Sequence, residues 1–128
     1  MTAIDDLLAR ARKRIDRVEP AEALAEMRDG AILVDVRSES QIARDGSVPG
    51  AIVVPRNILE WRCAPDGDHR DPRLGDPCAR VIVMCDGGYQ SSLATANLRE
   101  LGLHRAVDLA GAFQAWRQAG LPVTSSAR

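Results

Sequence analysis

Short apolar runs alternate along this chain with segments whose apolar residues recur at helical spacing. Strands are expected over residues 31–36, an apolar run broken only by Asp35, over 51–54, over 80–84, where Val81–Met84 are apolar, and over 106–109. Such continuous runs are typical of strands that are buried on both faces of a parallel sheet. We also expect a short edge strand that begins near Ile15 and includes Arg17 and Val18. The pattern therefore predicts an α/β fold in which strands and helices alternate.

The remaining segments predict helices by their spacing and end signals. The first has Ile4, Leu7, Leu8, Ala11 and Ile15 on one stripe, and its basic end, Arg12-Lys13-Arg14, is interpreted as solvated. Later helices are expected from Pro20 to Gly30, after residue 37, around Ile58 to Trp61, from Ser91 to Leu101, and around Phe113 and Trp116. We expect one domain over residues 1–128, with the helix of residues 1–14 packed on it.

Composition and charge exclude several functional classes. The chain has 128 residues, of which 17 are basic and 18 acidic, so a net charge of −1 gives no reason to expect nucleic acid or an anionic membrane as a partner. No apolar run approaches the roughly 20 residues of a membrane span, and the start lacks the pattern of a signal peptide, so a cytoplasmic location is expected. Three cysteines without paired spacing and two isolated histidines, His69 and His104, predict no disulfide framework, metal site or cofactor.

Cys85 is the main candidate for a chemically reactive side chain. It ends the apolar run Val81–Met84 and opens a glycine-rich turn, Asp86-Gly87-Gly88-Tyr89-Gln90-Ser91, which leads directly into a helical pattern. The carboxyl end of a buried parallel strand is where open α/β sheets place their reactive groups. Loop amides and the positive end of a helix favour a thiolate over a thiol. The alternative is a buried structural thiol, which the glycine loop makes the weaker interpretation.

The side chains around Cys85 leave alternatives open. Asp86 either contacts a substrate or caps the following helix, and Tyr89 either lines the pocket mouth or covers the loop. Cys78 precedes the strand and should lie roughly 20 Å from Cys85, too far for a disulfide. Cys63 lies on a loop at the correct end of the sheet, where it either approaches Cys85 or is a bystander.

Four segments of the chain, in this order and spacing, resemble the rhodanese (sulfurtransferase) family in its single-domain form. They are Leu33-Val34-Asp35-Val36-Arg37, Gly46-Ser47-Val48-Pro49-Gly50-Ala51, Cys85-Asp86-Gly87-Gly88-Tyr89-Gln90-Ser91, and Leu109-Ala110-Gly111-Ala112-Phe113-Gln114-Ala115-Trp116 followed by Gly120-Leu121-Pro122-Val123. The resemblance implies a three-layer sandwich, in which helices cover both faces of a five-stranded parallel sheet. Asp35 and Arg37 are interpreted as a structural pair at the end of this sheet.

The resemblance also implies an activity and its site residues. Cys85 would carry a sulfane sulfur as a persulfide, taken from a small donor and passed to a thiol or protein acceptor. The loop amides from Asp86 to Ser91 would hold the persulfide. Members that use thiosulfate commonly have basic residues at the positions of Asp86 and Gln90, so this loop favours a persulfide donor. Arg56 and Arg62 follow the third strand and are expected near the same edge of the sheet.

The sequence leaves two alternatives to a sulfurtransferase open. A binding module would use the same fold without turnover, and a redox sensor would form a reversible Cys63–Cys85 disulfide. Phosphatases on a related fold have a longer loop closed by an arginine that holds phosphate, and neither Gln90 nor Ser91 can do this, so phosphoryl transfer is not expected.

Overall fold

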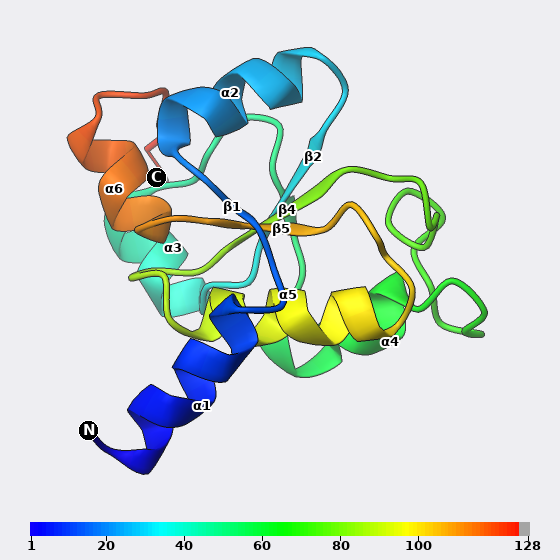
Figure 1. The fold of residues 1–128 in the computed structure, drawn as a ribbon. Coiled ribbons are helices and arrows are strands. Elements are labelled where there is room, and N and C mark those ends of the chain that lie inside the picture. The colour runs from blue at the N-terminus through cyan, green and yellow to red at the C-terminus, as the bar shows by residue number, and fades with distance from the viewer. Residues whose placement is uncertain (126–128) are drawn as a thin grey trace.

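A computed structural model describes residues 1–125 of the chain. Its centre is a sheet of five strands, all parallel, in the order β1-β5-β4-β2-β3 (Figure 1). The strands are β1 (Arg17–Val18), β2 (Ile32–Asp35), β3 (Ile52–Val53), β4 (Val81–Met84) and β5 (Val107–Leu109). The predicted α/β class and the five-stranded parallel sheet are therefore confirmed.

Helices cover both faces of this sheet. They are α1 (Ala3–Arg12), α2 (Pro20–Arg28), α3 (Glu39–Asp45), α4 (Leu59–Cys63), α5 (Gln90–Glu100) and α6 (Ala112–Gln118), with a 3₁₀ turn η1 (Arg56–Ile58) before α4. α1 and α4 pack against α5 on one side, and α2 packs against α6 on the other (Figure 1). The three-layer sandwich is confirmed.

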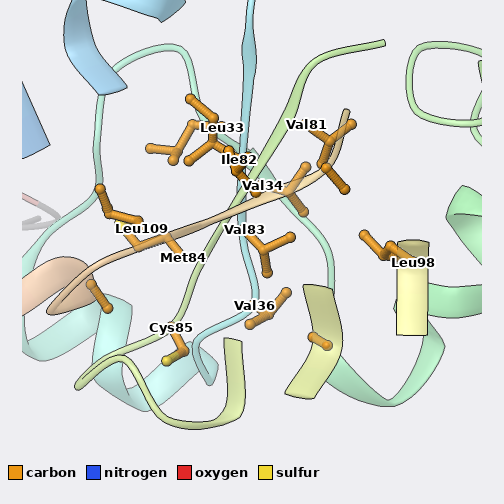
Figure 2. Close-up of a cluster of buried hydrophobic side chains, with 14 of the residues drawn as sticks. Leu33, Val34, Val36, Val81, Ile82, Val83, Met84, Cys85, Leu98 and Leu109 are labelled. Atoms are coloured by element: carbon orange, nitrogen blue, oxygen red, sulfur yellow. The ribbon is translucent and has the colours of Figure 1, made fainter. Parts of the chain in front are cut away.

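Strand β4 is the central element of the core. All four of its side chains are fully buried, between β2 on one side and β5 on the other. Its neighbours pair in register, with Val83 opposite Val34 and Ile82 opposite Val107. Figure 2 shows these side chains closing around the strand, with Cys85 at its carboxyl end. A continuous apolar run is required here because both faces of a parallel sheet lie under helices.

The strand order changes direction between β2 and β4. The chain leaves β2 toward β3 on one edge and later leaves β4 toward β5 on the other. In open α/β sheets the two connections diverge at such a point and leave a crevice at the carboxyl ends of the strands. Arg37 follows β2 and Cys85 follows β4, so both lie at this crevice.

The end of β2 is braced by a buried ion pair, as the sequence predicts. Arg37 Nη2 lies 2.8 Å from Asp35 Oδ2 and donates to the carbonyl oxygen of Gly46 at 2.9 Å. Its guanidinium stacks on the ring of Phe113, 3.8 Å from the ring centre. Arg37 Nη1 has no hydrogen-bond partner among the described residues. The pair therefore joins β2, the end of α3 and the start of α6.

Helix α1 packs on the sheet layer over only part of its length. Thr2 caps it through a capping box with Asp5, and Ala11 and the following Ile15 are buried against Ala96 of α5. In its first half the predicted apolar stripe faces solvent, because Ile4 is 61 % exposed. Figure 1 shows this half extending away from the rest of the molecule. No helix within residues 1–125 has the length and apolar character to cross a membrane.

We predict that Asp35→Ala lowers the free energy of unfolding by about 3–5 kcal/mol, because it leaves the buried Arg37 charge without its carboxylate. Urea denaturation would measure the change. Asp16→Ala is the matched control, since Asp16 pairs with Arg99 but is 82 % exposed, and it should change stability by less than about 1 kcal/mol. Equal effects of the two substitutions would contradict a bracing role for the buried pair.

Candidate active site

The thiol of Cys85 lies at the carboxyl end of β4 and is almost completely buried, with 2 % of the residue exposed. The backbone N–H of Gly88 donates to its sulfur at 3.1 Å, and the thiol donates to the hydroxyl of Ser91 at 3.2 Å. The loop therefore curls around the sulfur and directs one backbone N–H at it. Backbone N–H groups that converge in a loop commonly bind anions.

The shape of the loop depends on a close contact between two glycines. Gly88 has a φ of +92°, and a Cβ at this position would lie 3.1 Å from the backbone nitrogen of Gly111. The start of α6 fixes the same loop by two backbone bonds. The N–H of Phe113 donates to the carbonyl of Cys85, and the N–H of Gln114 donates to the carbonyl of Asp86, each at 3.1 Å. The start of α6 thus holds the thiol loop in place.

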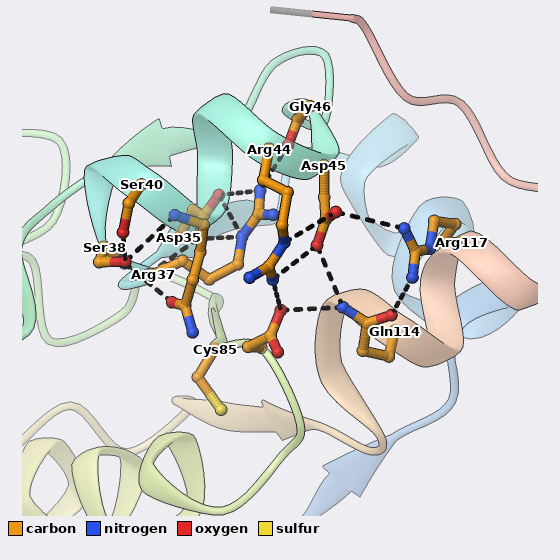
Figure 3. A network of polar contacts seen from close by, with 12 residues as sticks. Asp35, Arg37, Ser38, Ser40, Arg44, Asp45, Gly46, Cys85, Gln114 and Arg117 are labelled. Carbon is orange, nitrogen blue, oxygen red and sulfur yellow. Dashed lines mark hydrogen bonds and ion pairs between the residues drawn. The ribbon is translucent and has the colours of Figure 1, made fainter.

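The carboxylate of Asp86 is directed toward α6 and α3. It accepts a hydrogen bond from Gln114 Nε2 at 2.9 Å and lies 4.0 Å from Arg44 (Figure 3). Arg44 also binds Asp45, and this hydrogen bond lowers the pKa of Asp45 below its usual value. The helix-cap interpretation of Asp86 is wrong, because Tyr89 holds the N-cap position of α5 and no side chain caps it. Asp86 instead belongs to a polar network beside the loop.

The other predicted loop residues differ in their surroundings. Tyr89 is 67 % exposed, and its ring lies over Gly87, where an added Cβ would come within 3.2 Å of it. Tyr89 therefore covers the outside of the loop. Gln90 is exposed, begins α5 and borders a cavity.

A cavity of about 620 Å³ is lined by residues that follow β2 and by residues at and after the end of β3, and Gln90 at the start of α5 borders it. Arg56 lines it together with Gln90 and is paired with Glu60 at 2.9 Å. Arg62 is not part of this lining, and it donates to the carbonyl of His69 in the segment after α4. The structure thus places Arg56, but not Arg62, at the cavity near the loop. The lining residues are Val36, Arg37, Ser38, Glu39, Gln41, Val53, Pro55, Arg56, Asn57 and Gln90.

A buried carboxylate behind the loop was missed by the sequence reasoning. Asp108 is fully buried in β5 and accepts hydrogen bonds from the hydroxyls of Ser91 and Ser92. Arg17 of β1 lies 2.9 Å from the same carboxylate. The thiol of Cys85 is therefore linked through Ser91 to an ion pair. The signal in the sequence is that Asp108 is the one charged residue of the apolar run 106–109.

The interpretation of Arg12 as part of a solvated helix end is wrong. Arg12 Nη2 donates to the carbonyl of Gly88 at 2.8 Å, and its Nε donates to the hydroxyl of Ser92 at 3.1 Å. Arg17 reaches the same carbonyl at 3.4 Å. Lys13 and Arg14, the other members of the basic run, are exposed as expected. A guanidinium from α1 thus contacts the residue whose N–H binds the Cys85 sulfur.

The other two cysteines make none of the hydrogen bonds described above. Cys63 is fully buried at the end of α4, and burial raises the pKa of its thiol to about 12. Cys78 is exposed and precedes β4, at the opposite end of the strand from Cys85. His69 and His104 are both exposed. No group of three or more His, Cys, Asp or Glu side chains within residues 1–125 is arranged to hold a metal ion.

We predict that Gly88→Ala disturbs the thiol loop, because the new methyl group meets the backbone of Gly111 in a conformation that alanine rarely adopts. The loss of stability should be roughly 1–3 kcal/mol, accompanied by a changed alkylation rate of Cys85. Gly102→Ala is the matched control, since its φ is +105° but nothing lies within 4 Å of the added Cβ. It should cost stability without changing Cys85 alkylation. Identical behaviour of the two variants would show that the Gly88–Gly111 contact does not shape the site.

Comparison with known proteins gives a consistent result. The model of the family described as "Rhodanese-like domain" matches residues 19–119. A protein of Allochromatium vinosum named "Sulfurtransferase" is 31% identical over 111 residues, which are 87% of this chain and 94% of that protein. The "Thiosulfate sulfurtransferase GlpE" of Pseudomonas fluorescens is 34% identical over 102 residues, covering 79% of this chain and 84% of that protein.

Among solved structures, a protein from Rhodopseudomonas palustris superimposes with a TM-score of 0.87 at 30% identity, covering 97% of this chain and 96% of its own. It is described as a protein of unknown function and a possible tyrosine phosphatase. The match to the family model spans most of the chain, from before α2 to the end of α6, and includes the Cys85 loop. On this evidence the chain belongs to the rhodanese-like family.

Proposed function

We propose that this protein is a sulfurtransferase that carries a sulfane sulfur as a persulfide on Cys85. One observation carries the proposal, namely the N–H of Gly88 that donates to the Cys85 sulfur at 3.1 Å within a glycine loop. Family membership and relatives named as sulfurtransferases support it. The loop from Asp86 to Ser91 contains no arginine, which disfavours the phosphatase chemistry suggested for the Rhodopseudomonas palustris protein.

Transfer takes place in two displacements at sulfur. The Cys85 thiolate attacks the outer sulfur of the donor, a new S–S bond forms, and the donor leaves with the electron pair of its broken bond. The acceptor thiolate then attacks the outer sulfur of the Cys85 persulfide, which restores the Cys85 thiolate. This is covalent catalysis with a modified-enzyme intermediate. Loop dipoles stabilise the negative charge in both forms without rearrangement.

A persulfide of a small thiol is the donor that we propose in preference to thiosulfate. A dianionic donor gains from cations that face the sulfur, whereas this loop carries Asp86 and the neutral Gln90. Gln114 and Arg44 hold the Asp86 carboxylate, so its repulsion is reduced but no positive charge replaces it. Donor and acceptor would enter through the cavity bordered by Gln90 and Arg56. Its size suits a peptide-sized thiol.

A redox sensor built on Cys63 and Cys85 is the less favoured function. Thiol–disulfide exchange needs a thiolate, and burial raises the pKa of Cys63 to about 12. Cys63 is also fully buried, so a dissolved oxidant has no direct access to it.

We predict that Cys85→Ser abolishes sulfur loading while the protein stays folded. Intact mass after incubation with glutathione persulfide should show one added sulfur atom on the wild type and none on Cys85→Ser. Loading from thiosulfate should be at least about tenfold slower. Cys78→Ser is the control, because Cys78 is an exposed thiol at the other end of β4 and its loss should leave loading unchanged.

Two results would overturn this function. Persistent loading in Cys85→Ser would assign the sulfur to another residue. Failure of both donors to load the wild type would favour a binding module that uses the fold without turnover. Equal or faster loading from thiosulfate would overturn the donor preference alone.

We predict that Cys63 stays unmodified when the native protein is treated with a maleimide at pH 8, because a pKa of about 12 leaves few molecules as thiolate. Cys78, which is exposed, should be modified in the same sample. Peptide mass analysis distinguishes the two. Modification of Cys63 at the rate of Cys78, or a Cys63–Cys85 disulfide formed by mild oxidant, would revive the redox function.

A further inference from the structure

We propose that Arg12 of α1 supplies the positive charge that the Cys85 loop lacks, and so favours the anionic forms of Cys85. This inference deepens the proposed function, because it concerns the same thiol. Arg12 lies outside residues 19–119, the segment that the family model matches. Its role is therefore argued from its contacts with the loop in this chain.

The contacts of Arg12 converge on the loop residue that binds the sulfur. Its guanidinium donates to the carbonyl of Gly88 at 2.8 Å and to the hydroxyl of Ser92 at 3.1 Å. It also lies 6.0 Å from the centre of the Tyr89 ring, over the outside of the loop. The N–H of Gly88 donates to Cys85. Gly88 is thus the single residue between the guanidinium of Arg12 and the sulfur of Cys85.

The charge of Arg12 is not neutralised by a neighbour. No carboxylate among the described residues lies within ion-pair distance of its guanidinium, and both of its hydrogen bonds go to neutral oxygens. A carbonyl that accepts from a guanidinium is polarised, and the positive charge acts through the partly buried loop with little screening by solvent. A full positive charge on this side lowers the free energy of an anion at Cys85.

The other charged groups near Cys85 occur in pairs that largely cancel. Arg17 of β1 is bound to Asp108 of β5, and Arg37 is bound to Asp35 at the end of β2. Asp86 lies in the network that joins Arg44 and Asp45 of α3 to Arg117 of α6. At the cavity, Arg56 is bound to Glu60. Arg12 therefore determines the sign of the net electrostatic potential at Cys85.

The burial of α1 explains how Arg12 is held in place. Only the end of the helix is anchored, through Ala11 and the nearby Ile15, and this anchor lies beside Arg12 in the sequence. The side chain of Arg12 is half-buried, whereas Lys13 and Arg14 point to solvent. The helix is thus fixed at the turn that carries the guanidinium.

The test compares the pH dependence of Cys85 alkylation in Arg12→Gln, Arg12→Lys and wild type, all with Cys78→Ser to remove the exposed thiol. Iodoacetamide is the probe, and peptide mass analysis reports Cys85. Removing the positive charge disfavours the thiolate, so Arg12→Gln should move the midpoint of the rate profile upward by roughly half a unit to one pH unit. Arg12→Lys keeps the charge and should stay close to wild type. Arg14→Gln, an exposed neighbour on the same helix end, is the matched control and should not move the midpoint.

Two outcomes would overturn the inference. An unmoved midpoint in Arg12→Gln would show that the charge does not reach Cys85. An equal upward shift in Arg12→Lys would show that the shape of the guanidinium contact matters and its charge does not. Circular dichroism checks that each variant is folded, and Arg12→Met, which keeps the length of the side chain without charge, takes the place of Arg12→Gln if that variant fails to fold. Because alkylation needs no sulfur donor, this result is independent of whether Cys85 carries a persulfide.

Discussion

The contact between Gly88 and Gly111 is the constraint on which the rest of the site depends. It brings the loop after the central strand onto the start of α6, with so little space that a Cβ on Gly88 would lie 3.1 Å from the backbone nitrogen of Gly111. With Gly88 in this position, its N–H is directed at Cys85 and its carbonyl is turned toward Arg12. The same residue thus contacts the Cys85 sulfur, the start of α6 and α1.

The electrostatics of the site follow from this geometry. A loop with an aspartate after the cysteine and a glutamine at the helix start has no cation of its own. The structure compensates in two ways. Gln114 and Arg44 turn the aspartate away from the thiol, and arginines from outside the loop contact it from behind. At the cavity, both arginines of the described lining have a carboxylate partner, since Arg56 is bound to Glu60 and Arg37 to Asp35.

The sequence predicted those parts of the molecule that depend on local pattern. The strands were found because a parallel sheet covered on both faces requires continuous apolar runs, and the thiol loop was found because its glycines follow such a run directly. The Asp35–Arg37 pair was also found, as two charges placed at the end of a buried strand. These features need only neighbouring residues to be recognised.

The parts that the sequence did not predict depend on contacts between distant segments. Nothing in the pattern around Arg12 indicates that its side chain turns back to a loop 76 residues away. The direction of Asp86 is set by Gln114, which another helix brings into place. The apolar stripe of α1 correctly predicted a helix, but it did not show that Ile4 would face solvent, because amphipathic spacing gives a buried face only where a partner surface exists.

The wide separation of these contacts has a consequence for folding. The bonds from Arg12 to the loop span 76 and 80 residues, and α6 must dock before the Gly88 contact closes. Contacts of such long range form late, since the intervening chain must first be ordered. During synthesis, therefore, Cys85 leaves the ribosome as an ordinary thiol on an unfinished sheet. It gains its enclosed environment only after the segment that ends with α6 has followed, because that segment supplies the backbone N–H groups that hold the loop.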